Sequence, residues 1–431
     1  MLNLVFHSLF LIFFSLSFLY TYNNVDGYKK LFIFSLLIKI ILIFINYNLF
    51  LLPDANGDAI GFNQHARDWS YEYDLLEILN LFWDHPFGTG GKAYTHTRIV
   101  AVIYELVGYH PYVIHTLNIC FNFFSIVFCI KIIKIIYSKN SIDFTSLFLL
   151  LFSPSLFIYS VNLLKEPYVV FFNILAIYFL VLYLKNKNSI YVLISSSVFY
   201  INQYFAEIFI WFSIFLFLIF IIIVINRIIK TYIESIILKY SIFFTLFLFS
   251  LFVIIIKIDL PFISIFYIDN PIICDLNCQK NFNRGFIHKL VYLQEYTYEG
   301  IHVIPKYIYT NNHYDLLITA PFRLLYFYLF PFLIDVDSFV EIFLFIDSYI
   351  FLILIIMVFF YYPYIIKNNY LLFLSILLIL FSIPYAFAHS NQGTLFRHRS
   401  KFLMIFITLY APLLHYSIFE LVFKKLYNKI R

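Results

Sequence analysis

The chain has 431 residues, of which 63% are hydrophobic, 23% are aromatic and only 12% are charged, and its mean hydropathy is +0.87. Soluble domains carry about 25% charged residues, so this composition excludes a water-soluble globule and indicates a polytopic membrane protein. The net charge of +5 is modest for a membrane protein and predicts membrane lipids, with no nucleic acid, as its surroundings.

Apolar runs separated by polar breaks predict an all-α fold with about eleven transmembrane helices, because about 20 apolar residues cross a bilayer. Residues 1–22 have no basic start and no small-residue cleavage site, so we expect them to be a retained span. No linker or repeat is visible, and residues 1–431 are expected to form one transmembrane domain. The expected spans are residues 1–22, 31–52, 113–137, 142–160, 167–184, 189–205, 207–226, 240–258, 339–362, 369–388 and 401–420.

Short basic connections recur on one side of these spans and indicate the cytoplasmic side. The alternation then predicts an external N-terminus and a cytoplasmic C-terminus. The sequence has no Asn-x-Ser/Thr sequon, which favours a bacterial inner membrane over a secretory-pathway membrane. The basic connections contain Lys29 and Lys30; Lys131, Lys134 and Lys139; Lys185 and Lys187; Arg227, Lys230 and Lys239; Lys367; and Lys424, Lys425, Lys429 and Arg431.

Two long loops are predicted on the external side. In residues 53–112, large apolar residues recur near helical spacing from Asp68 to Phe82, and Thr97 to Val107 forms a second such segment; both are expected to be interfacial helices. In residues 259–338, the Pro-bounded apolar end over 320–332 predicts a re-entrant or interfacial helix. The same loop holds Cys274 and Cys278, for which a short disulfide and a metal pair both remain open.

Carboxylates stand out in this apolar chain at two external positions. Asp54 and Asp58 flank an Asn-Gly turn after the second span, and a helix beginning near residue 57 would stabilise an ionised Asp58. The structural alternative is an ordinary helix cap. Glu166 precedes Pro167, which predicts an extended residue with a directed carboxylate; the alternative is an interfacial marker. If the loops converge, the two acids form one pocket for binding and proton abstraction.

A cluster of cations lies at the last external segment, against the positive-inside pattern. Arg397, Arg399 and Lys401 follow Gly393 and Thr394, and this arrangement predicts a phosphate site because Arg presents a planar fork of donors. Ordinary anionic headgroups are the alternative partner. No His-Glu-x-x-His order is present, so a zinc site is not predicted. Further polar residues that would line the same pocket, or merely serve its turns, are His65, Gln203, Glu207, His389 and Asn391.

Several short motifs resemble one family of membrane enzymes. Asp58-x-x-x-Phe62-x-x-x-Ala66 resembles the Asp-x-x-x-Tyr-x-x-x-Ala pattern of GT-C type integral-membrane glycosyltransferases, including the bacterial dolichyl-phosphate-mannose-protein mannosyltransferase-like family. The sequence departs from this family in Phe62, in Lys165 where the family has Arg, and in an extra N-terminal span. Later segments in similar order are Thr97–Val107, Gly108-x-x-Pro111, Asn118, Leu163-Leu164-Lys165-Glu166 and Tyr326-x-x-x-Phe330-Pro331-Phe332.

The resemblance implies transfer of a sugar from a polyprenyl-phosphate-linked donor to a lipid, glycan or protein acceptor on the exoplasmic face. Asp58 would be the general base, with Asp54 or Glu166 assisting it or holding a divalent cation such as Mg²⁺ or Mn²⁺. Arg397, Arg399, Lys401 and Lys165 would bind the donor phosphate. Two alternatives are a polysaccharide polymerase or ligase of the O-antigen type and a transporter or flippase of lipid-linked sugars. Against the transporter, only Lys39 is clearly placed in the middle of an expected span.

Overall fold

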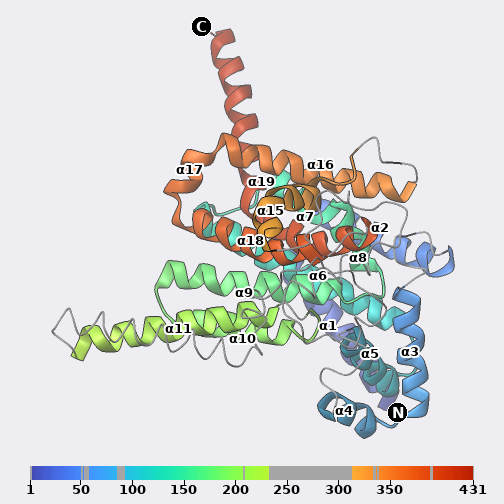
Figure 1. The fold of residues 1–431 in the computed structure, drawn as a ribbon. Helices are drawn as coiled ribbons and strands as arrows, with labels where there is room; N and C mark the ends of the chain where they lie inside the picture. The colour runs from blue at the N-terminus through green and yellow to red at the C-terminus, as the bar shows by residue number, and fades with distance from the viewer. Residues whose placement is uncertain are drawn as a thin grey trace.

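The computed structural model describes residues 2–49, 52, 58–84, 93–206, 209–232, 313–332, 336, 339–388 and 392–430, and every regular element in these ranges is a helix (Figure 1). The helices are α1 (Leu2–Asn24), η1 (Asp26–Tyr28), α2 (Lys29–Leu49), α3 (Ile60–Glu72), α4 (Leu75–Asp84), α5 (Ala93–Val107), α6 (Pro111–Ile136), α7 (Phe144–Phe152), α8 (Pro154–Val161), α9 (Glu166–Asn186), α10 (Ile190–Asn202), α11 (Phe209–Tyr232), α15 (His313–Leu329), α16 (Phe339–Phe360), α17 (Tyr362–Lys367), α18 (Asn369–Ala388) and α19 (Gln392–Ile430).

Six helices of the described part are long and apolar enough to cross a membrane, namely α1, α6, α9, α11, α16 and α18, and the bent pair of α7 and α8 brings the number to seven. This agrees with a multi-pass membrane protein, but the expected count of about eleven is not confirmed. Of the remaining expected spans, 240–258 lies outside the described residues, 189–205 corresponds to the shorter helix α10, and 31–52 and 401–420 correspond to α2 and to part of α19.

The dipeptide Ser153-Pro154 divides the expected span 142–160 into two helices, α7 and α8. Asp143 caps α7 by accepting a hydrogen bond from the Ser146 backbone N–H at 2.8 Å. Pro154 begins α8, and the residue before it, Ser153, has an extended conformation with ψ of 129°, because a proline ring disfavours the helical region for its predecessor. The two helices therefore meet at an angle of 45°.

The first long loop contains three helices that pack on one another. The expected helix over residues 68–82 is instead divided between α3 and α4, because Asp74 starts a new helix there: its carboxylate accepts from the Glu77 backbone N–H at 2.8 Å, and Glu77 accepts from the Asp74 N–H at 2.9 Å. This reciprocal capping box satisfies two N–H groups that a helix start leaves unpaired. The helix expected over 97–107 is present as the greater part of α5.

Glycine sets the junction between α5 and α6. Gly108 has a φ of 85°, a left-handed conformation that commonly ends a helix, and its N–H bonds the Tyr104 carbonyl at 2.8 Å. Pro111 then occupies the first position of α6, where its missing N–H costs nothing. This junction turns the chain from the first loop into the bundle.

Helix α19 contributes a large part of the buried core. Residues 399–413 are all buried, and α19 contacts α6, α7, α8, α9, α16 and α18. Its C-terminal end extends away from the other helices, while α9, α10 and α11 lie side by side on another flank (Figure 1). The N-terminal end of α19 lies beside α8 and α16, where Phe396 shares an apolar cluster with Tyr159 and Leu344. Helix α15 overlaps the segment 320–332, where a re-entrant or interfacial helix was expected at the end of the second long loop.

Replacing Asp74 with alanine should loosen the start of α4. Loss of a capping carboxylate costs about 1 kcal/mol, so amide hydrogens in the first turn of α4 should exchange several times faster with deuterium. Glu72→Ala, which removes an exposed acid at the end of α3, is the matched control. Equal exchange in the two variants would contradict the capping box.

Candidate functional site

The motif Asp58-x-x-x-Phe62-x-x-x-Ala66 lies on one face at the start of α3. Asp58 stands two residues before α3 begins. Phe62 packs with Ala59 against a small apolar cluster that includes Phe396 of α19, and Ala66 is fully buried against α5. Residues four apart share a face of a helix. The packing of Phe62 and Ala66 therefore holds this face of α3, and Asp58 with it, close to the start of α19.

Glu166 is the first residue of α9, with Pro167 in the first helical turn. The expected extended conformation before proline is therefore wrong, because proline is well accommodated in the first turn of a helix. The helix N-terminus also favours a carboxylate at this position. Glu166 is completely buried.

Asparagines hold the turn that leads to Glu166. The Asn118 amide of α6 donates to the Asn162 carbonyl at 2.6 Å and to the Leu164 carbonyl at 3.3 Å. Asn46 of α2 donates to the Asn162 side chain at 2.9 Å. Because these amides are buried, each bond replaces a costly unsatisfied polar group. Helices α2 and α6 therefore determine where Glu166 enters α9.

Arg397 joins the two carboxylates. Its Nε lies 2.6 Å from Glu166 Oε1, and its Nη1 donates to Asp58 Oδ2. The side chains form a gradient of exposure, with 0% for Glu166, 12% for Arg397 and 56% for Asp58. Three segments that are distant in the sequence therefore meet in one ion-paired group, which we call the Asp–Arg–Glu triad. Its outer carboxylate is accessible from outside the protein.

Further cations surround the triad. Lys401 is 1% exposed, its Nζ lies 2.5 Å from His398 Nδ1 and 5.1 Å from the centre of the Tyr385 ring, and it is within electrostatic range of Glu166. Lys165 immediately precedes Glu166 and acts on it in the same way. With Arg397, the described group brings three basic side chains beside two carboxylates.

Arg399 is not brought to the triad. Its guanidinium is 1% exposed, and its Nη1 donates to the carbonyls of Tyr328 and Phe330 at 3.1 and 2.6 Å and to Ser348 Oγ at 2.9 Å. Nη2 donates to the Leu344 carbonyl at 3.2 Å. These hydrogen bonds hold α15 and α16 against α19. Arg399 was expected to bind a phosphate, but its observed contacts stabilise the fold.

The other predicted residues have varied positions. His65 is exposed on α3, and Gln203 is buried after the end of α10. No group of three His, Cys, Asp or Glu residues that would hold a metal is present in the part of the chain that the structure describes. Asp54, Glu207, His389, Asn391, Cys274 and Cys278 lie outside the described residues.

No sequence pattern indicated a role for His96, which lies beside the triad. His96 of α5 is 1% exposed, packs 5.5 Å from the Tyr168 ring and 6.3 Å from the Phe62 ring, and is within electrostatic range of Glu166. Burial lowers the pKa of His96 to about 3, because desolvation penalises the charged imidazolium. Its side chain is therefore neutral near pH 7.

No family model, curated protein or solved structure matches the chain.

Removing Arg397 should destabilise the protein through Glu166. Arg397→Gln leaves a buried carboxylate without its cation, which costs about 3–5 kcal/mol. Adding Glu166→Gln removes that charge, so the double variant should be more stable than Arg397→Gln alone. Unfolding by denaturing detergent in mixed micelles measures the four free energies of this cycle. Strictly additive effects would contradict a coupled pair.

His96 should contribute to acid sensitivity. Its pKa is lowered from 6.5 to about 3 in the folded protein, so the unfolded chain binds more protons between these values, and stability falls as the pH drops below 6.5. His96→Gln, which is neutral at every pH, should lessen this fall by about 1.4 kcal/mol per pH unit. Unfolding measured from pH 7 to pH 4 tests this; identical slopes in both proteins would contradict it.

Proposed function

We propose that the protein is a membrane glycosyltransferase that moves a sugar from a polyprenyl-phosphate-linked donor to a lipid, glycan or protein acceptor. The observation that carries the proposal is the triad, in which Arg397 binds the exposed Asp58 and the buried Glu166 together. An accessible carboxylate beside an anion-binding cation supplies the two groups that sugar transfer from a phosphate requires. The GT-C resemblance of the sequence around Asp58 points to the same chemistry.

Asp58 takes the role of general base in this proposal. Its side chain is 56% exposed, so an acceptor hydroxyl can reach its oxygen without disruption of the fold. The base withdraws the hydroxyl proton as the acceptor oxygen attacks the anomeric carbon, and the bond from that carbon to the phosphate oxygen breaks. Glu166 is fully buried and already bound to Arg397, which suits a positioning role better than a second base.

Arg397 takes the role of the phosphate-binding residue, with Lys401 and Lys165 adding positive charge. A donor phosphate competes with Asp58 for the Arg397 Nη1 donor, whereas the Nε bond to the buried Glu166 at 2.6 Å anchors the guanidinium. Binding of donor thereby releases Asp58 from its ion pair and leaves its carboxylate oxygens available to the acceptor hydroxyl. The same cations stabilise the charge that develops on the departing phosphate.

The setting of this reaction follows from the sequence. Basic connections on one side favour an external N-terminus and a cytoplasmic C-terminus, with the triad on the exoplasmic face of a bacterial inner membrane. If a divalent cation such as Mg²⁺ or Mn²⁺ pairs with the donor phosphate, Asp58 is the carboxylate that would hold it.

A transporter or flippase of lipid-linked sugars is the second candidate. Two buried charges within membrane helices favour it: Lys39 is 1% exposed, and Asp347 of α16 is fully buried. The sequence-based argument that only Lys39 stands within a span is therefore too strong. A polymerase or ligase of O-antigen type would use the same triad and differ in its products.

Asp58→Asn separates these functions. A base-catalysed transferase should lose about 10²- to 10⁴-fold in turnover, while binding of the polyprenyl-phosphate sugar persists or tightens because Arg397 loses a competing carboxylate. The measurement is transfer from a panel of such donors by protein in nanodiscs, with donor binding followed in parallel. A ladder of products would indicate a polymerase.

Asp68→Asn is the matched control, because Asp68 is also a partly exposed aspartate of the first loop and pairs with Arg67 at 3.1 Å. It should leave turnover and binding unchanged. Full turnover by Asp58→Asn would exclude the catalytic role. Movement of lipid-linked sugar across vesicles by that variant, with no transfer by the wild type, would favour the flippase.

A further inference from the structure

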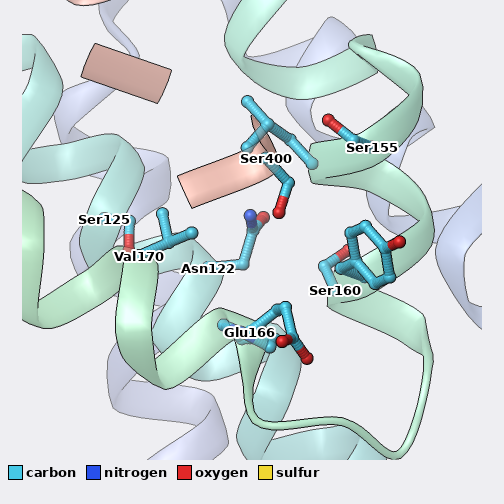
Figure 2. Close-up of a pocket in the computed structure, with 10 residues that line it drawn as sticks. Asn122, Ser125, Ser155, Ser160, Glu166, Val170 and Ser400 are labelled. Carbon is cyan, nitrogen blue, oxygen red and sulfur yellow. The ribbon is translucent and has the colours of Figure 1, made fainter. Parts of the chain in front are cut away.

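Helix α6 has two sides of different chemistry. One side faces the bundle, where Asn122 and Ser125 line a small polar cavity together with Glu166 (Figure 2). The other side carries half-buried aromatic residues, spaced by three or four positions, and ends in a lysine. Its members are Phe121, Phe124, Phe128 and Lys131. Because this spacing places them on one side of the helix, we call these four residues the α6 stripe.

Helices α1 and α9 both pack on α6, with the α6 stripe between them. The ring centre of Phe124 lies 5.7 Å from that of Phe13 in α1 and 6.2 Å from that of Phe171 in α9. About one turn further along α6, the Phe128 ring lies 5.1 Å from the Tyr178 ring of α9. All five rings are only half-buried. They therefore form one aromatic surface that a lipid chain can reach.

Lys131 lies at the end of this surface, and aromatic rings enclose its ammonium group. Its Nζ donates to the Tyr20 hydroxyl of α1 and lies 5.1, 5.4 and 5.9 Å from the ring centres of Tyr20, Phe128 and Tyr178. The negative face of an aromatic ring attracts a cation. Since the contacts come from α1, α6 and α9 together, they hold the ammonium at one place between the three helices.

No carboxylate accompanies this cation in the three helices that hold it. Helices α1 and α6 contain no acidic residue, and α9 contains only Glu166, its first residue. Within the part of the chain that the structure describes, Lys131 forms no ion pair. A charge removed from water is costly unless an opposite charge pairs with it, and aromatic rings compensate only part of that cost. An anion from outside the chain would complete this site.

The position of Lys131 suits a lipid phosphate. Lys131 lies in the turn before the last turn of α6, which ends at Ile136, on the side that the short basic connections predict to be cytoplasmic. This places the ammonium near the level of the lipid headgroups. An ammonium has three donors, so Lys131 keeps donors beyond its bond to Tyr20, and the Tyr20 hydroxyl, which accepts that bond, keeps its own hydrogen. Both groups can therefore donate to phosphate oxygens.

We propose that Lys131, Tyr20 and the adjoining aromatic surface bind one anionic phospholipid of the cytoplasmic leaflet. The lipid phosphate accepts hydrogen bonds from Lys131 and Tyr20. An acyl chain then runs toward the middle of the bilayer over Phe128 and Phe124, in that order. A zwitterionic lipid brings its own cation to the phosphate, so an anionic lipid complements the unpaired charge of the site better. The bound lipid joins α1 to α6 and α9.

This lipid site is separate from the Asp–Arg–Glu triad. Asn118 of α6 holds the turn that leads to Glu166, and about 20 Å along the helix separates Asn118 from Lys131. A polyprenyl-phosphate donor at the triad would be on the exoplasmic face, whereas Lys131 is near the opposite end of α6. The lipid site therefore does not rest on the proposed glycosyltransferase function.

Lipid retention by the purified full-length protein tests the proposal. The protein is equilibrated with equal amounts of phosphatidylglycerol and phosphatidylcholine that have the same acyl chains, and native mass spectrometry counts the lipids that stay bound. The wild type should retain one phosphatidylglycerol in preference to phosphatidylcholine. Lys131→Met should lower this retention by about fivefold, the effect of one lysine near an anionic lipid. Tyr20→Phe, which keeps the ring, should give a smaller loss.

Lys185→Met is the matched control. Lys185 is an exposed lysine in the last turn of α9, on the same expected cytoplasmic side, so it reports the general attraction of a basic surface for anionic lipids. Its loss of retention should be clearly smaller than that of Lys131→Met. Equal losses in the two variants, or no preference of the wild type for phosphatidylglycerol, would overturn the site. Thermal unfolding identifies the folded variants, and Tyr20→Phe decides the matter if Lys131→Met does not fold.

A high-resolution structure in nanodiscs that contain phosphatidylglycerol shows where the lipid binds. We expect a phosphate oxygen within about 2.7–3.2 Å of Lys131 Nζ or of the Tyr20 hydroxyl, with an acyl chain over Phe128 and Phe124. A well-resolved surface without a lipid phosphate, or a polyprenyl phosphate bound there in place of the phospholipid, would overturn the proposal. Neither measurement uses sugar transfer, so failure of the proposed function would leave the result unchanged.

Discussion

The ion pair between Arg397 and Glu166 is the constraint on which the site depends. A completely buried carboxylate is costly unless a cation pairs with it, and Arg397 supplies that cation from the beginning of α19 with an Nε to Oε1 distance of 2.6 Å. Forming the pair requires α19 to pass over the start of α9. The same guanidinium then reaches Asp58, so the first loop is joined to the bundle by the residue that neutralises Glu166.

The contacts that hold the triad in place are apolar at its exposed end, near Asp58, and polar at its buried end, near Glu166. Around Asp58, Ala59 and Phe396 belong to an apolar cluster that fixes the loop on α19. Below Glu166, Asn118 holds the preceding turn through two backbone carbonyls. The inner end of the triad is therefore rigid and its outer end accessible. That division supports the proposal that Glu166 positions Arg397 and that Asp58 reacts with substrate.

The sequence pointed to all three residues of the triad, among other candidates, because Asp58, Glu166 and Arg397 are charged residues at expected external ends of apolar segments. It could not separate Arg397 from Arg399: residues two apart on a helix point in different directions, and only the partners of each show which one faces the site. His96 was missed because a histidine within an ordinary helical pattern carries no sign of its neighbours. The expected count of about eleven spans is not confirmed; within one expected span, hydropathy does not reveal that Ser153 and Pro154 bend the segment into two helices.

Charges inside the membrane helices bear on the choice between transfer and transport. Such charges cost about 2.5–3.5 kcal/mol at the centre of a helix, so each requires compensation. Asp347 accepts from the Ser155 backbone N–H at 3.1 Å and lies within electrostatic range of Arg399, so it is explained by its contribution to packing between α8, α16 and α19. Lys39 has an amide partner and aromatic neighbours. Lys39 therefore has its own partners inside the bundle, so its position within a helix is not by itself an argument for an ion path.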